Sequence, residues 1–112
     1  MTTLLVLYRR PDGGEEALAT LESRYRDEHL PLAATTPGLR NIRIWRVAEA
    51  LGSETKLVLA AAMDFDDRAA LDEGLRSDPM RAAGRNLREI APGLATFLVV
   101  EEAPDLLGGP AQ

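Results

Sequence analysis

Four short segments of the chain carry the apolar patterns that are typical of β-strands, and turn-forming residues separate them. The first, Thr3–Arg9, is mostly apolar and stops at the turn Pro11–Gly14. The second alternates, because Ile42 and Ile44 fall on one face while Trp45 falls on the other. The third is apolar on both faces. The pattern predicts strands over residues 3–9, 41–48, 56–65 and 94–101.

Between these strands, apolar residues recur with the period of a helix. One helix begins at Glu15 and should weaken near Leu30, because Pro31 lacks a backbone N–H and restricts the residue before it. The pair Asp66–Asp67 is typical of a helix N-cap, and Ser77–Pro79 begins a further helix. The apolar faces of these helices are predicted to hold Leu18, Leu21, Tyr25, Leu71, Leu75, Met80, Ala83, Leu87 and Ile90.

The predicted order is therefore β-α-β-β-α-β, which indicates a ferredoxin-like α+β sandwich, a four-stranded antiparallel sheet with its helices on one face. The other face of the sheet is also apolar, since Leu5 and Leu7 alternate with Leu4, Val6 and Tyr8. A second copy of the same sheet would cover it, so we expect a homodimer with a barrel-like layer between two sheets. Residues 1–102 should form this one domain, and residues 103–112 a flexible C-terminal tail.

Composition removes many kinds of chemistry. The chain has 112 residues, no cysteine, a single histidine and a formal net charge of −5. Zinc fingers, iron–sulfur clusters, thiol nucleophiles and two-histidine metal sites are excluded, and the acidic balance argues against nucleic acid as a partner. The segment Asp12–Gly14 lacks the spacing of a phosphate-binding loop. We expect neither a metal nor a cofactor.

The longest apolar run, Leu57–Met63, is far shorter than the ~20 residues that a membrane span needs. The segment Met1–Thr3 also lacks the basic start of a secretion signal. These features predict a cytoplasmic protein that does not bind a membrane.

His29 is the candidate for proton transfer, because an imidazole exchanges protons near neutral pH without help from its surroundings. It follows Tyr25 by four residues, which places both side chains on one face of the predicted helix just before Pro31. Such a histidine can lie half-buried over a cavity. The alternative is a surface histidine that the helix dipole favours at a C-terminus.

Further candidates lie near the ends of the predicted strands. Tyr8 and Arg9 could offer a phenol and a guanidinium to an anionic or phenolic ligand, or they could be a packed tyrosine and a solvated arginine. Trp45 either lines an aromatic pocket or packs in the dimer core. Asp64 could orient a histidine, although a carboxylate at this position is also typical of capping.

Three segments resemble the EthD family of small dimeric α+β barrel proteins. They are the first strand and its turn, Leu5–Asp12, the end of the first helix, Tyr25–Ala33, and the segment Pro37–Arg40. The resemblance includes the element His29-Leu30-Pro31-Leu32-Ala33, is most specific in the N-terminal third of the chain and extends to about Glu102. The chain differs from the family in having Leu18 and Leu21 where members often carry aromatic residues, and in the residues around Asn86 and Ile90.

The resemblance implies a hydrophobic pocket between helices and sheet, with His29 as an acid or base and Tyr8, Arg9, Tyr25, Trp45 and Asp64 as substrate-binding residues. Related barrels include cofactor-independent monooxygenases, polyketide cyclases and lactone isomerases. The implied function is thus a cofactor-independent oxidoreductase, or a cyclase or isomerase, that acts on a hydrophobic cyclic substrate. The alternative is a non-catalytic accessory protein that binds a hydrophobic small molecule.

Overall fold

The computed structural model describes residues 1–108 as a single sheet with one layer of helices. The four strands are β1 (Thr2–Arg9), β2 (Asn41–Arg46), β3 (Leu57–Phe65) and β4 (Ala95–Glu101). The helical elements are α1 (Gly14–Arg24), the π-helical turn η1 (Tyr25–His29), α2 (Leu30–Ala33), α3 (Arg68–Leu75), α4 (Asp78–Ile90) and the 3₁₀ turn η2 (Pro104–Leu107). All four predicted strands are present, and no strand end differs from the predicted one by more than two residues.

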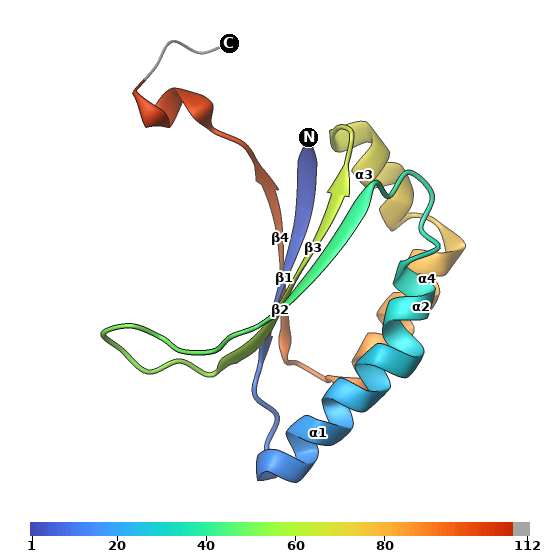
Figure 1. Cartoon of the computed structure of the whole chain (residues 1–112). Coiled ribbons are helices and arrows are strands. Elements are labelled where there is room, and N and C mark those ends of the chain that lie inside the picture. The colour runs from blue at the N-terminus through green and yellow to red at the C-terminus, as the bar shows by residue number, and fades with distance from the viewer. Residues whose placement is uncertain (109–112) are drawn as a thin grey trace.

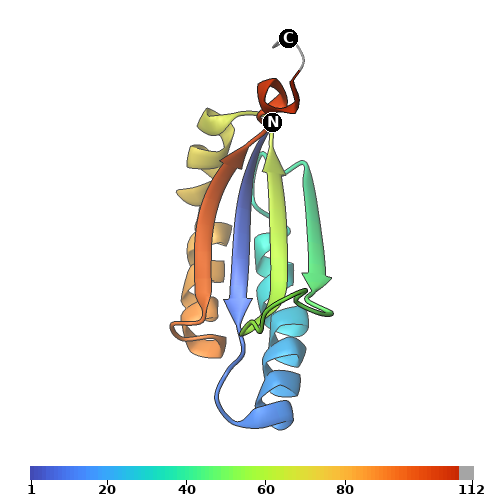
Figure 2. The same ribbon diagram turned by 90° about the vertical axis from the view of Figure 1, so that its left-hand side faces the viewer.

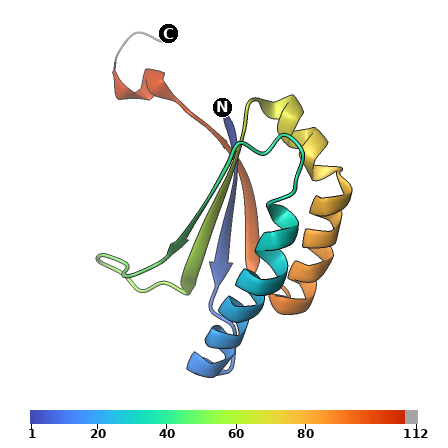
Figure 3. The same ribbon diagram turned by 45° about the vertical axis from the view of Figure 1, so that its right-hand side comes forward.

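The strands pair in the order β2-β3-β1-β4, and every neighbouring pair is antiparallel. Figure 2 shows this order from the side of the sheet that carries no helix. The α-helices and η1 lie on the other side, where α1, η1 and α2 form one row and α3 and α4 form a second (Figures 1 and 3). The predicted ferredoxin-like α+β sandwich is confirmed. No helix among residues 1–108 has the length and apolar character to cross a membrane.

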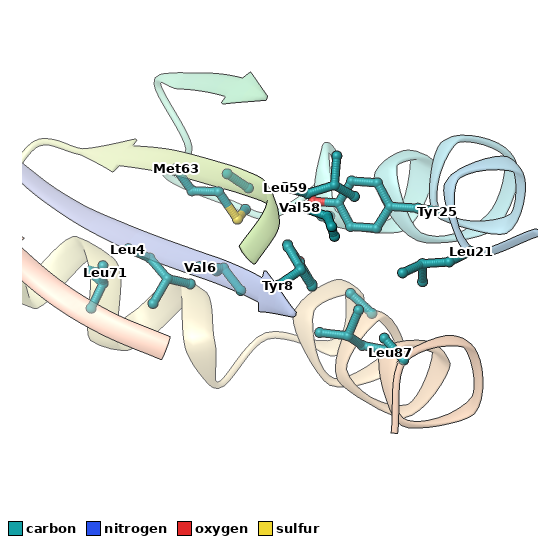
Figure 4. Close-up of a cluster of buried hydrophobic side chains, with 14 of the residues drawn as sticks. Leu4, Val6, Tyr8, Leu21, Tyr25, Val58, Leu59, Met63, Leu71 and Leu87 are labelled. Atoms are coloured by element: carbon teal, nitrogen blue, oxygen red, sulfur yellow. The ribbon is translucent and has the colours of Figure 1, made fainter. Parts of the chain in front are cut away.

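The core fills the layer between sheet and helices. Leu4, Val6 and Tyr8 point into it from β1, because side chains of one strand alternate between its two faces. Their β3 partners in the register, Met63, Ala61 and Leu59, are also buried. In Figure 4 Tyr8 lies between Tyr25, from the first helical row, and Leu87, from α4. The face of β1 that holds Tyr8 is therefore the face that holds the core.

The prediction that the first helix weakens near Leu30 is wrong, because the chain stays helical through Ala33. The helix accommodates Pro31 by widening into the π turn η1, in which the Leu30 N–H donates to the Tyr25 carbonyl five residues earlier. A proline ring presses on the carbonyl four residues before it, and the wider turn leaves room for that carbonyl. Burial of Ala33, only 2% exposed, stabilises the extra helical turn.

The second half of the helical layer begins at the predicted caps. The Asp67 carboxylate accepts the backbone N–H of Ala70 at 2.9 Å and starts α3. The Ser77 hydroxyl accepts the N–H of Met80 at 3.4 Å and starts α4, which has Pro79 in its first turn. These caps fix where α4 starts along the sheet.

The helix-free face of the sheet is apolar and exposed. Trp45, Leu98 and Val100 lie on it and are between 37% and 43% exposed. The hairpin between β2 and β3 and the chain after β4 both project toward this side (Figure 1). Within the predicted tail, η2 forms a short turn, while residues 109–112 lie outside the described part. The flexibility of the tail stays a prediction.

Candidate functional site

A cavity of about 50 Å³ lies between the sheet and the helices. Its wall is apolar apart from three side chains, Tyr8, Tyr25 and His29. The remaining wall residues are Leu4, Val6, Ile42, Ala61, Met63 and Phe97 from the sheet, and Leu30, Ala33, Met80, Ala83, Gly84 and Leu87 from the helices. An apolar cavity with a few converging polar groups is the usual form of a small-molecule site.

The three polar side chains form a row of rings that begins in the sheet and ends in η1. The ring centroids of Tyr8 and Tyr25 are 5.2 Å apart in an edge-to-face arrangement. The rings of Tyr25 and His29 are stacked at 5.1 Å. The spacing of four residues predicts the second contact, and the parity of β1 places Tyr8 on the same side of the sheet. In Figure 4 the Tyr25 ring reaches from its helix toward the strands.

Both tyrosines are held in their neutral form. Burial raises the pKa of Tyr8 far above its ordinary value, and burial also raises the pKa of Tyr25. The contact between the two hydroxyls raises the pKa of Tyr8 further and opposes the rise at Tyr25. Both hydroxyls therefore keep their protons, and the two tyrosines that line the cavity can offer O–H groups to a bound molecule.

His29 is buried, and burial favours the neutral form of its imidazole. The residue is only 8% exposed, and this burial lowers the pKa of the imidazole. The Ala83 backbone and the Asn86 side chain act in the opposite direction and raise the pKa. Its Nδ1 atom is buried and has no hydrogen-bond partner among residues 1–108. Such an atom costs about 1–3 kcal/mol when it stays unpaired. A neutral imidazole with a free ring nitrogen beside a cavity can accept a proton from a bound molecule.

A polar network holds η1 against α4. The Arg24 guanidinium donates to the Glu28 carboxylate through two N–H groups, at 2.8 and 3.0 Å. The Asn86 side-chain amide donates to the same carboxylate at 3.0 Å, from the neighbouring helix. The Asn86 Oδ1 atom is buried and unpaired within the described residues, like His29 Nδ1. The network therefore fixes the turn that carries His29.

Three candidate residues lie on the opposite face of the sheet and do not line the cavity. Asp64 accepts a hydrogen bond from Thr3 at 2.5 Å and forms an ion pair with Arg43 at 3.3 Å. Arg43 also lies over the Trp45 ring, 5.3 Å from its centroid. Arg9 donates to the Thr96 hydroxyl and the Gly93 carbonyl.

The placement of Asp64 corrects the expectation that it could orient His29, because the sheet separates the two side chains. Trp45 and Arg9 are likewise not in contact with this cavity. All three belong to the face for which the sequence predicts a second copy of the chain. Among residues 1–108, no three imidazole or carboxylate side chains are grouped so that they could hold a metal ion, and the expected absence of a metal stays a prediction.

Sequence reasoning missed two residues of the site. Phe97 lines the cavity from the edge strand β4 and is 58% exposed. Its position facing the helices follows from its pairing with Val6, which the sequence alone does not give. Asn86 precedes the buried Leu87 and follows Ala83 by three residues, a helical spacing that could have placed it beside His29.

Among solved structures, the chain is similar to an ethyl tert-butyl ether D (EthD) family protein from Bacillus halodurans. The two are 30% identical with a TM-score of 0.81, and the match covers 92% of this chain and 99% of the other. A dimeric ferredoxin-like protein of unknown function from Bacteroides fragilis is 23% identical with a TM-score of 0.62, covering 90% and 95%. An antibiotic biosynthesis monooxygenase is 14% identical with a TM-score of 0.64, and the match covers 93% of this chain and 100% of the other, a likeness of fold. No protein-family model and no curated protein matches the chain.

Proposed function

The chain belongs to the EthD family, and we propose that it binds a small, largely apolar molecule between sheet and helices and removes a proton from it with His29. One observation carries the proposal. His29 lines an apolar cavity, and its Nδ1 atom is buried and unpaired within the described chain. A substrate O–H or activated C–H at that atom would satisfy it, and burial keeps the ring neutral so that it can act as a base.

The proton passes from the substrate to the imidazole, and the substrate retains the electron pair as an anion. The Tyr8 and Tyr25 hydroxyls are the protein donors of the cavity that can bind this anion. Arg9 is unsuited to this task, because its guanidinium is engaged on the opposite face of the sheet. The anion then cyclises, isomerises or reacts with dioxygen, according to its own structure. A role as a cofactor-independent monooxygenase, a cyclase or an isomerase is consistent with this first step.

The volume of the cavity limits the substrate. About 50 Å³ holds one or two water molecules, whereas pockets for drug-sized ligands measure ~300–1,000 Å³. A cyclic substrate therefore requires wall residues to move apart. Met80 is suited to this because its unbranched side chain changes shape readily, and it is only partly buried.

We propose that the protein is a homodimer in which the helix-free sheet faces of two copies pack against each other. The apolar, exposed side chains of that face support this arrangement, as does the dimeric ferredoxin-like protein of similar fold. In such a dimer, Trp45, Arg43 and Asp64 would lie at the interface between sheets.

The test is a comparison of His29→Ala with the wild-type protein and with Asp27→Ala, an exposed residue of the same turn. Screening against phenols and polyketide-like compounds should give turnover that the His29 variant lacks and the Asp27 variant keeps. Circular dichroism checks that both variants fold. Turnover that survives in His29→Ala would contradict the role of His29.

The non-catalytic alternative gives a different result. A binding protein would retain an unchanged hydrophobic molecule, which mass spectrometry of the denatured protein would detect, and no compound of the screen would be converted.

A further inference from the structure

The cavity beside His29 continues into a wider groove at the surface. The groove, of about 310 Å³, lies between α4 and the start of β4. It shares Gly84, Leu87 and Phe97 with the cavity. Because Phe97 is largely exposed, the inner cavity reaches the surface where these three residues meet. A molecule too large for the cavity can thus keep its outer part in the groove.

Gly84 lies at this junction, and packing does not require a glycine there. A Cβ atom on Gly84 would have one neighbour within 4 Å, Arg88 Nη1 at 3.9 Å, which is an ordinary contact. A Cβ atom on Gly74 of α3 would instead lie 2.9 Å from the buried Phe65 ring. A glycine inside a helix is less favourable than alanine. Packing therefore does not explain why α4 has the less favourable glycine at position 84. The space left by the missing side chain opens into both the cavity and the groove.

Arg88 gives the groove a positive charge. It lines the groove one helical turn after Gly84, and its guanidinium lies against that glycine. Among residues 1–108 no carboxylate pairs with it, whereas Arg24 binds Glu28 and Glu89. Its place in the last turn of α4 is favourable to a cation but leaves the guanidinium N–H groups available. A free guanidinium is well suited to bind a carboxylate through two hydrogen bonds.

We propose that the groove is the subsite for the carboxylate of a small aromatic or aliphatic acid, with Arg88 binding the carboxylate and the apolar part passing over Gly84 to His29. The inference rests on the proposed function of His29, and it names the class of substrate. Arg88 lies five positions after Ala83, whose backbone contacts His29. Five positions span about 7.5 Å along the helix axis, at 1.5 Å per residue. A single aromatic ring with a short acidic side chain has a matching length.

The experiment compares two probes that differ only in charge, 4-hydroxyphenylacetate and 4-hydroxyphenylacetamide. Each is titrated into the full chain while NMR follows the His29 imidazole, which reports on the cavity, and the Gly84 amide, which reports on the groove. The variants are Arg88→Gln and, as a matched control, Arg85→Gln on the exposed side of the same helix. The wild-type protein and the Arg85 variant should bind the acid about tenfold or more tightly than the amide. The Arg88 variant should bind both equally.

Gly84→Ala provides a second test, because it keeps every charge and places a methyl group in the path. It should fold at least as stably as the wild-type protein, yet bind the acid more weakly.

Equal binding of acid and amide by the wild-type protein, or a preference for the acid that persists in Arg88→Gln, would overturn the inference while leaving the function of His29 intact. If the protein prefers the acid, and the acid shifts the Gly84 signal but never the His29 signal, the result would support the carboxylate subsite and contradict the proposed function. If neither probe moves either signal, both are overturned.

Discussion

Two glycines in helices, Gly74 and Gly84, have opposite surroundings, and their replacement should have opposite effects. Gly84→Ala should raise the free energy of unfolding by up to about 1 kcal/mol, because alanine is the better helix former and its Cβ meets open space. Gly74→Ala should lower it by about 1–3 kcal/mol, because its Cβ would lie 2.9 Å from the Phe65 ring. Urea unfolding of the two variants beside the wild-type protein measures both changes. A destabilised Gly84→Ala would show that packing, and not a ligand, requires this glycine.

Residue spacing predicted only part of the candidate site. Tyr25 and His29 are four apart in a helix, so their contact could be predicted, and Tyr8 shares the strand face of Leu4 and Val6. Trp45 and Asp64 were expected near the same pocket, but they lie on the other face of the sheet. The alternation of a strand says which residues share a face, yet not which face the helices cover when both are apolar. That choice depends on how the helices pack.

At the scale of elements, the π turn η1 shows how packing overrides a local signal. Pro31 is a strong helix breaker in isolation, and the preceding Leu30 would ordinarily leave the helical region. Leu30 nevertheless keeps a helical φ of −61°, and the wide turn places His29 in the core. The strands and the caps at Asp67 and Ser77 could be predicted because their signals are local. The continuation through Pro31 could not, because it depends on burial of Ala33 against the rest of the fold.

The contact between η1 and α4 allows us to predict the direction in which the pKa of His29 changes when Asn86 is replaced. The Asn86 side chain raises the pKa of His29 and so opposes the larger effect of burial. Asn86→Ala should therefore lower the pKa of His29 further below its ordinary value, because only the burial effect and the Ala83 backbone remain. NMR titration of the imidazole measures the change, with Asn41→Ala on the exposed start of β2 as the control. A higher His29 pKa in Asn86→Ala would show that the amide does not act on the ring in this way.

At the scale of the whole molecule, the helix-free face of the sheet should hold two 12.2 kDa chains together. Because the interface is symmetric, a charged substitution on this face would place two charges in the dimer interface, one from each copy. Trp45→Asp or Leu98→Glu should weaken association by at least about tenfold, which corresponds to ~1.4 kcal/mol. Leu75→Glu, on α3 with a similar exposed fraction of 39%, should have no effect. Sedimentation equilibrium at micromolar concentration measures this, and a wild-type protein that sediments as a monomer would contradict the dimer.

His29 can act as the base inside the fold only if its imidazole is neutral, and the pKa of His29 is the most direct measure of this. The chain has one histidine, so its imidazole signals in NMR need no further assignment. We would titrate the full chain from about pH 5 to pH 9, with and without phenolic ligands. Burial should hold the pKa of His29 below 6.5, so that the ring is neutral and able to accept a proton at pH 7, and a bound phenol should shift this pKa again. A pKa close to 6.5 that no ligand changes would mean a solvated histidine and would contradict the proposed site.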